Sequence, residues 1–116
     1  MPAFHILHNP KCSKSRACLQ LLEAHGVQAH IRLYLESPLS LAELHVLHAA
    51  LGGNVREMLR ADDPAARAAG LDDSGLSDDQ LLQGVASFPA LMQRPIVIVG
   101  DRALVCRPPE RVLTLL

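Results

Sequence analysis

Cys12 lies at a position in the chain where a thiol is easily activated. It follows an apolar run at residues 3–8 and stands at the start of a predicted helix. Unpaired backbone N–H groups and the helix dipole at such a position favour the thiolate, which is the nucleophilic form. The cations Lys11, Lys14 and Arg16 act in the same direction, and the first 22 residues contain no Asp or Glu. The pattern predicts a reactive cysteine, whereas most free cysteines are inert core residues.

Two familiar cysteine motifs are missing around this residue. Ser15 stands where a C-x-x-C pair needs its second cysteine, and Cys18 stands where a phosphatase-type loop needs arginine. A redox reaction at Cys12 therefore needs a second thiol from another molecule. Cys18 and Cys106 are predicted to be core residues, because free cysteine behaves as a small hydrophobe. For Cys106 a disulfide with Cys12 is the alternative.

Three arginines and a histidine are further candidates for chemistry. Arg94 and Arg107 each precede a proline, which holds the backbone extended. Arg60 ends a predicted short helix. Such residues are ordinarily solvated surface cations, but guanidinium groups converging on a thiolate would suit a tetrahedral oxyanion through paired N–H donors. His8 ends the first predicted strand, where it can orient or ion-pair the Cys12 thiolate or be an ordinary half-buried histidine.

Periodicity and turn residues predict the elements that must position these groups. Strands are predicted at residues 3–8, 28–35, 96–99 and 103–106, the last two joined by the hairpin turn Gly100-Asp101. Helices are predicted at 13–25, 40–50, 55–60, 64–69, 78–87 and 108–116. In the last helix, α-helical spacing turns Val112, Leu113 and Leu116 inward.

The order of the elements predicts an α/β fold. A helix between the first two strands favours a right-handed parallel crossover, and the hairpin adds antiparallel strands. This order is that of the thioredoxin-like arrangement, a mixed four-stranded sheet flanked by helices. The segment between the second and third strands is too long for a simple connection. We therefore expect one domain over residues 1–116, with a helical insertion at about 38–92.

Composition excludes several function classes. The chain has 116 residues, a net charge of −1 and 3% aromatic residues, which argues against a nucleic-acid partner. No apolar run approaches the length of a membrane span, and no secretory signal precedes the first strand. An odd count of three cysteines does not make a disulfide framework, so a reduced cytoplasmic setting is expected. No metal-site spacing is present, and a monomer is the default expectation.

The loop around Cys12 resembles the active-site loop of the glutaredoxin-coupled arsenate reductase family. The resemblance continues in the same order almost end to end. It is carried by His8-Asn9-Pro10-Lys11-Cys12-Ser13-Lys14-Ser15-Arg16, Leu33-Tyr34-Leu35-Glu36, Leu59-Arg60, Arg94-Pro95-Ile96-Val97 and Cys106-Arg107-Pro108-Pro109-Glu110. The best-studied members have Gly-Thr where this chain has Ser13-Lys14, so the loop is most similar to a Cys-Ser-Lys-Ser subgroup.

The resemblance implies a thioredoxin-like fold, an activity and a set of site residues. Cys12 would be the nucleophile, and His8 would help to lower its pKa. Arsenate and its thiol adducts would be held by Arg60, Arg94 and Arg107. The supporting residues would be Asn9, Ser15, Arg16 and Pro95, the last preceded by a cis peptide bond. Glutathione would be a co-substrate and glutaredoxin the resolving partner, with no bound cofactor.

Two other functions fit the same residues. One is a thiol-disulfide oxidoreductase of this fold that acts on glutathione mixed disulfides. The other is a non-catalytic regulator that binds RNA polymerase, although Ser15 removes the C-x-x-C switch usual in that family.

Overall fold

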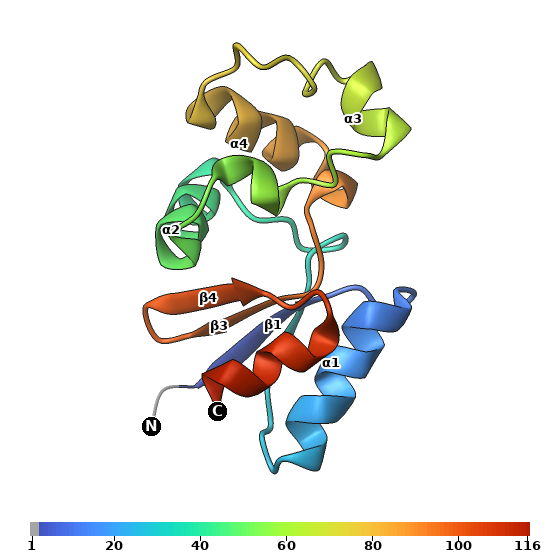
Figure 1. Cartoon of the computed structure of the whole chain (residues 1–116), viewed down its shortest axis with the longest axis vertical. Helices are drawn as coiled ribbons and strands as arrows, with labels where there is room; N and C mark the ends of the chain where they lie inside the picture. The colour runs from blue at the N-terminus through green and yellow to red at the C-terminus, as the bar shows by residue number, and fades with distance from the viewer. Residues whose placement is uncertain (1–2) are drawn as a thin grey trace. The chain divides into compact units, whose positions relative to one another are not determined.

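Four strands form one mixed sheet in the computed structural model, which describes residues 3–116 (Figure 1). The strands are β1 (Phe4–His8), β2 (His30–Leu33), β3 (Ile96–Val99) and β4 (Arg102–Val105), in the spatial order β2-β1-β3-β4. β1 and β2 are parallel and are joined through helix α1 (Ser13–Ala24). β3 pairs antiparallel with both β1 and β4. The mixed four-stranded sheet predicted from the order of elements is confirmed.

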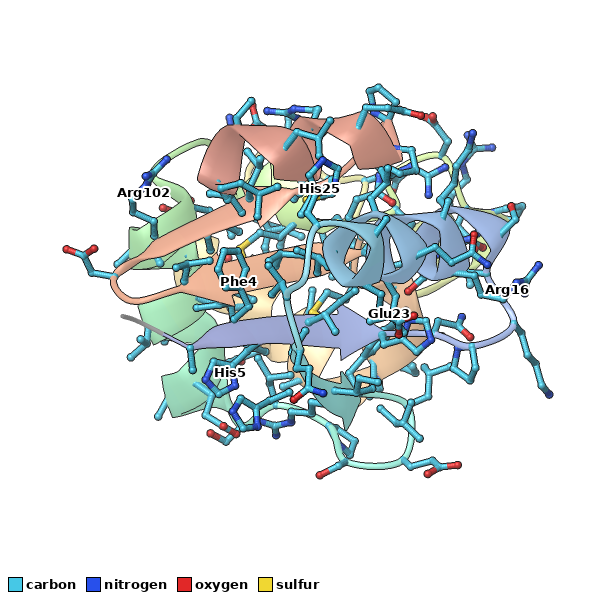
Figure 2. All side chains as sticks on the ribbon, turned by 90° about the horizontal axis from the view of Figure 1, so that it is seen from below. Phe4, His5, Arg16, Glu23, His25 and Arg102 are labelled. Atoms are coloured by element: carbon cyan, nitrogen blue, oxygen red, sulfur yellow. The ribbon has the colours of Figure 1, made fainter. Side chains whose placement is uncertain are left out.

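One face of this sheet carries an apolar core. Side chains alternate along β1, so that Phe4 and His5 point to opposite faces (Figure 2). The face of Phe4 packs against α1 and against η3 (Pro109–Leu115), a 3₁₀ helix. The fully buried members of the core are Ile6, Cys18, Leu22, Val97, Cys106 and Val112. Both Cys18 and Cys106 are therefore core residues, as predicted.

Two strands differ from their predicted bounds. The strand predicted at 28–35 is limited to His30–Leu33, because the chain turns back after it. The backbone N–H groups of Glu36 and Ser37 both donate to the Leu33 carbonyl, at 3.0 and 2.8 Å. The second hairpin strand spans Arg102–Val105, one residue earlier than predicted at each end. Val99 pairs directly with Arg102 across the two-residue turn, in which Gly100 has a φ of 61°.

The last helix corrects the prediction for its inward face. Val112 is fully buried, but Leu113 and Leu116 are 38% and 52% exposed. A 3₁₀ helix has three residues per turn, so residues spaced by three share a face. Pro109, Val112 and Leu115 therefore form the inward row. The predicted inward direction was wrong for two leucines because α-helical spacing was assumed.

The chain divides into two compact units. The sheet unit contains the residues up to Ser37 and from Arg94 onward, and the second unit is Pro38–Gln93. The second unit is helical and contains α2 (Leu41–Leu51), η1 (Val55–Met58), α3 (Pro64–Ala68), α4 (Asp78–Ser87) and η2 (Pro89–Leu91). That the helical unit and the sheet unit together form a single domain stays a prediction. Over residues 3–116, no helix combines the length and apolarity needed to span a bilayer.

Local sequence determines where the two longer helices of the second unit begin. Ser40 and Glu43 form a capping box at the start of α2. Ser77 caps α4, and Gln80 completes a second capping box there. The helices predicted at 55–60 and 64–69 are both shorter than expected, and the first is a 3₁₀ helix.

Candidate active site

A hydrogen-bonded loop holds Cys12 at the N-terminal end of α1. The Cys12 N–H donates to the Asn9 carbonyl at 3.0 Å, and the Lys11 N–H donates to the Asn9 side-chain oxygen at 3.0 Å. The Arg16 guanidinium reaches back to the Pro10 carbonyl at 2.8 Å. Asn9 and Arg16 therefore support the loop that carries the thiol, and Cys12 itself is the N-cap residue of α1.

The environment of Cys12 favours the thiolate. Partial burial by itself would raise its pKa. The backbone N–H groups of Ser15 and Lys14 and the guanidinium of Arg94 outweigh that effect and hold the pKa below the ordinary thiol value of 9.0. The sulfur makes no capping hydrogen bond of good geometry, so the N–H groups act as oriented dipoles facing it. A thiolate in this position is a nucleophile that remains partly exposed to solvent.

His8 acts on this loop through Ser15. Its Nδ1 is 2.6 Å from the Ser15 hydroxyl oxygen, which also accepts the Asn9 N–H at 3.1 Å. His8 is buried, and Ser15 is fully so. Burial, followed by the positive charge of Arg16, lowers the pKa of His8 below its ordinary value of 6.5. His8 is therefore neutral at pH 7 and positions Ser15, whose own N–H faces the Cys12 sulfur.

Two of the three predicted arginines converge on the same end of the hairpin. The Arg94 side chain interacts directly with the Cys12 sulfur. The Arg107 guanidinium donates to the Arg94 carbonyl at 3.0 Å. The peptide bonds Arg94–Pro95 and Arg107–Pro108 are both cis, the first as the family resemblance implied. The Cys106 N–H donates to the Pro95 carbonyl at 2.9 Å and so joins the two Arg-Pro segments.

Arg60 belongs to the second unit. Its backbone N–H donates to the Leu91 carbonyl at 2.7 Å, beside the bridge between Leu59 and Met92. Its guanidinium lies 3.3 Å from the Asp63 carboxylate and 3.4 Å from the Ala90 carbonyl. The arginine is thus held in a defined position, with part of its charge balanced by a neighbouring acid.

Comparison with known proteins identifies the family. The model of the ArsC family matches residues 7–115 of this chain. The chain belongs to the ArsC family. The arsenate reductase of Neisseria meningitidis serogroup A is 44% identical over 113 residues, which is 97% of each chain. The arsenate reductase of Haemophilus influenzae is 46% identical over 112 residues, covering 96% of this chain and 97% of that one.

A solved structure of the ArsC family confirms the fold. The arsenate reductase from Vibrio cholerae superposes with a TM-score of 0.95 at 45% sequence identity, covering 99% of this chain and 98% of that one. The thioredoxin-like class predicted from the order of strands and helices is thereby confirmed.

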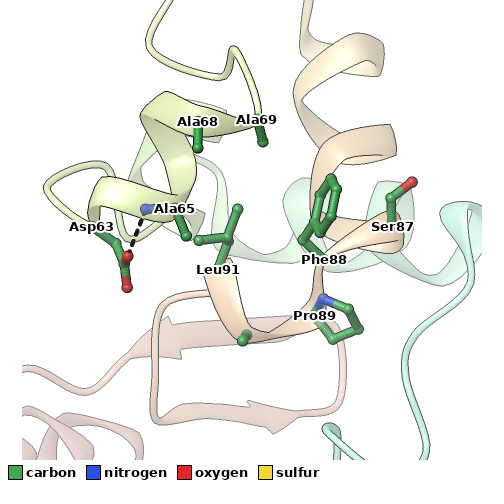
Figure 3. A pocket seen from close by; sticks show the side chains of 9 residues that line it. Asp63, Ala65, Ala68, Ala69, Ser87, Phe88, Pro89 and Leu91 are labelled. Atoms are coloured by element: carbon green, nitrogen blue, oxygen red, sulfur yellow. Dashed lines mark hydrogen bonds between the residues drawn. The ribbon is translucent and has the colours of Figure 1, made fainter.

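A pocket of about 530 Å³ lies within the helical unit of this ArsC-family chain (Figure 3). Its walls come from α3 with its two cap residues, and from the last residue of α4 together with the segment through η2. The lining residues are Asp63, Ala65, Ala68, Ala69, Ser87, Phe88, Pro89, Ala90 and Leu91. The Asp63 carboxylate is engaged with the Ala65 N–H at 2.9 Å as the cap of α3. The lining contains no cysteine, histidine or arginine, so this pocket lacks the groups that the Cys12 site provides.

The described part of the chain contains no cluster of three or more His, Cys, Asp or Glu side chains suited to a metal ion.

Sequence reasoning missed one arrangement of reactive groups. It placed Cys18 and Cys106 in the core one at a time, whereas both belong to the same fully buried core cluster. Their separation along the sequence carries no signal for this shared position, which the sheet and α1 create together.

Proposed function

We propose that this chain reduces arsenate to arsenite, with Cys12 as the nucleophile. The observation that carries the proposal is a thiol held at the N-terminus of α1 with its pKa lowered and a guanidinium beside it. In that arrangement the guanidinium attracts an oxyanion and the thiolate attacks its central atom. The ArsC-family membership and the relatives named arsenate reductases support arsenic as the reacting atom.

The proposed cycle begins when the Cys12 thiolate attacks arsenic and one arsenate oxygen leaves as water. Glutathione adds in the same way and displaces a second oxygen, so that arsenic carries two sulfur ligands. A glutaredoxin thiol then attacks the glutathione sulfur and forms a mixed disulfide. The electron pair of the broken As–S bond stays on arsenic, which becomes As(III). Water releases arsenite and regenerates Cys12. The two external thiols take the place of a resolving cysteine, because this chain has Ser15 where a C-x-x-C motif has its second cysteine.

The arginines would hold the arsenate and stabilise its negative charge. A guanidinium presents parallel N–H donors that match two oxygens of a tetrahedral oxyanion. Arg94 and Arg107 are supported in this role by their contact with each other and by the contact of Arg94 with Cys12. Arg60 is proposed as the third ligand from the family resemblance, and in this role its guanidinium would exchange its contact with Asp63 for the anion.

The remaining residues would position the reacting groups. Neutral His8 and Ser15 hold each other, and Ser15 directs its N–H toward the sulfur. Asn9 and Arg16 brace the loop, and the Pro95 carbonyl accepts the Cys106 N–H and so links the two Arg-Pro segments. We further propose that the protein works as a cytoplasmic monomer without a bound cofactor.

The proposal is tested by NADPH oxidation coupled through glutathione reductase, glutathione and glutaredoxin, with and without arsenate. We expect arsenate-dependent oxidation by the wild type and none above background by Cys12→Ser. Arg107→Lys keeps the charge but removes the paired donors, so kcat/KM for arsenate should fall about ten- to a hundred-fold. Arg102→Lys is the matched control, because Arg102 lies exposed on β4 and should leave the rate unchanged.

Other outcomes point to the alternative functions. If arsenate has no effect but glutathione bound to Cys12 is released to glutaredoxin, the chain is a thiol oxidoreductase with another substrate. If neither reaction occurs and the folded protein captures RNA polymerase subunits, the regulatory function is the correct one. Either result would overturn the arsenate proposal.

A further inference from the structure

The backbone at Arg60 is fixed by an antiparallel bridge. The bridge pairs Leu59 with Met92, and both of these side chains are buried. Beside it, the Arg60 N–H donates to the Leu91 carbonyl at 2.7 Å. Met92 lies only two residues before Arg94 in the chain. A short stretch of chain therefore connects the bridged backbone that holds Arg60 to Arg94.

One carboxylate makes two different contacts next to this arginine. Asp63 Oδ2 lies 3.3 Å from Arg60 Nη1 and forms an ion pair with it. Asp63 Oδ1 accepts the Ala65 N–H at 2.9 Å and so caps α3 (Figure 3). The Asp63 N–H donates to the Arg60 carbonyl at 3.0 Å, which closes the turn between the two residues. The cap and the turn hold the carboxylate beside the guanidinium independently of the ion pair.

The ion pair is partly open to solvent. The side chains of Arg60 and Asp63 are 32% and 23% exposed. The same Nη1 also donates to the Ala90 carbonyl at 3.4 Å. Ion pairs of this exposure are weak, so an anion arriving from solvent can displace the carboxylate. The guanidinium donor that Asp63 occupies is of the kind that binds an oxyanion.

We propose that Asp63 is an internal counter-ion of Arg60, which competes with the oxyanion substrate and sets its affinity. This inference rests on the proposed function, in which Arg60 binds arsenate. Asp63 acts through Arg60 and is therefore a positioning residue: it holds the guanidinium in place until an anion arrives. An arsenate that binds Arg60 has to displace the carboxylate, so the ion pair weakens anion binding. Removal of the Asp63 charge should therefore tighten it.

Asp63→Asn separates the ion pair from the cap of α3. Asparagine and aspartate are about equally good N-cap residues, so the side-chain oxygen still accepts the Ala65 N–H. The amide NH₂ takes the place of Oδ2 and is only a donor, so it does not pair with a guanidinium. Asp63→Ser is a second variant with an uncharged capping side chain.

The test measures the sulfate concentration that half-protects Cys12 from alkylation by iodoacetamide. Sulfate is a tetrahedral anion like arsenate, and the measurement needs no turnover. We expect half-protection of Asp63→Asn and Asp63→Ser at about two- to five-fold less sulfate than the wild type, the range that a partly exposed ion pair supports. In the coupled assay, KM for arsenate should fall by the same factor with kcat unchanged.

Two controls distinguish the ion pair from a general effect of charge. Asp62→Asn removes the same charge from the neighbouring residue, which is exposed, and should leave the half-protecting sulfate concentration unchanged. In an Arg60→Met background, Asp63→Asn should have no effect, because the guanidinium through which Asp63 acts is gone.

Four results would overturn the proposal. The first is Asp63→Asn protein that needs as much sulfate as the wild type or more. The second is an equal shift in Asp62→Asn, and the third is a shift that persists without Arg60. The fourth is a Cys12 that sulfate protects in no variant, since Arg60 then binds no anion there. The sulfate measurement contains no arsenate, so a failure here is distinct from a failure of the proposed function.

Discussion

The reactivity of Cys12 has two separable sources at the scale of single residues. The N–H groups of Ser15 and Lys14 belong to the same turn of chain as the sulfur, so any sequence that starts a helix there supplies them. Arg94 is distant from Cys12 along the chain, and only the folded structure brings its side chain to the sulfur. A substitution of Arg94 therefore separates the tertiary contribution from the local one.

We expect Arg94→Met to raise the pKa of Cys12. In the wild type, alkylation by iodoacetamide should be half-maximal below pH 9.0, because only the thiolate reacts and the folded protein favours it. The variant should shift that midpoint upward and slow alkylation at pH 7. Arg102→Met is the matched control. An unchanged midpoint in Arg94→Met would show that the helix N-terminus alone sets the pKa.

The buried His8–Ser15 pair leads to a second prediction at this scale. Ser15→Ala leaves the His8 Nδ1 and the Asn9 N–H without their shared partner. A buried polar group left unsatisfied costs about 1–3 kcal/mol, so the free energy of unfolding should fall by that amount. Urea denaturation measures it, with Ser13→Ala as the control at an exposed position of the same helix. Equal stability of the two variants would contradict the pairing.

At the scale of elements, the ends of β1, α1 and the β3–β4 hairpin together define the site. β1 delivers His8, the N-terminus of α1 delivers Cys12, and the Arg-Pro segments flank the hairpin. The N–H of Cys106 bonded to the Pro95 carbonyl holds those segments together. Parallel pairing with β2 and antiparallel pairing with β3 make β1 central, which places the loop after it beside the hairpin ends.

The last helix gives a prediction that distinguishes 3₁₀ from α-helical geometry. Val112→Ala removes two methyl groups from the core and should lower the free energy of unfolding by about 2 kcal/mol. Leu113→Ala acts on a side chain that is 38% exposed and should change it by less than about 1 kcal/mol. Thermal or urea unfolding of the two variants provides the comparison. The reverse order of effects would restore the α-helical face predicted from the sequence.

At the scale of the whole molecule, the helical unit Pro38–Gln93 interrupts the sheet unit in the sequence. Units this small bury only a modest fraction of their surface, so each has limited stability by itself. We therefore retain the single-domain prediction and expect the two units to unfold together.

Two probes test this cooperativity in urea. Exposure of the Cys18 and Cys106 thiols reports on the sheet unit, where both are buried. Far-ultraviolet circular dichroism reports on α2 and α4 of the helical unit together with α1 of the sheet unit, so its midpoint shifts from the thiol midpoint if the helical unit unfolds separately. The two midpoints should coincide in the Cys12→Ser background. Separate midpoints would show two domains that fold independently.

Sequence patterns were sufficient wherever a short stretch of chain decides the structure. Local patterns of this kind determine the reactive position of Cys12, the helix starts after Ser40 and Ser77, the hairpin at Gly100 and the order of elements along the chain. The arginines were already candidates from their positions, and the family resemblance supplied their role and the cis bond before Pro95, which local physics does not require.

Tertiary structure decided what depends on residues far apart in the chain. The burial of Val112 with Leu113 left exposed, and the meeting of Cys18 and Cys106 in one core cluster, depend on packing on one face of the sheet. The direct contact of Arg94 with Cys12 is of the same kind. Local rules specify backbone angles and caps through hydrogen bonds between near neighbours. Which distant side chains meet is set by the whole core, because only the complete packing balances their burial.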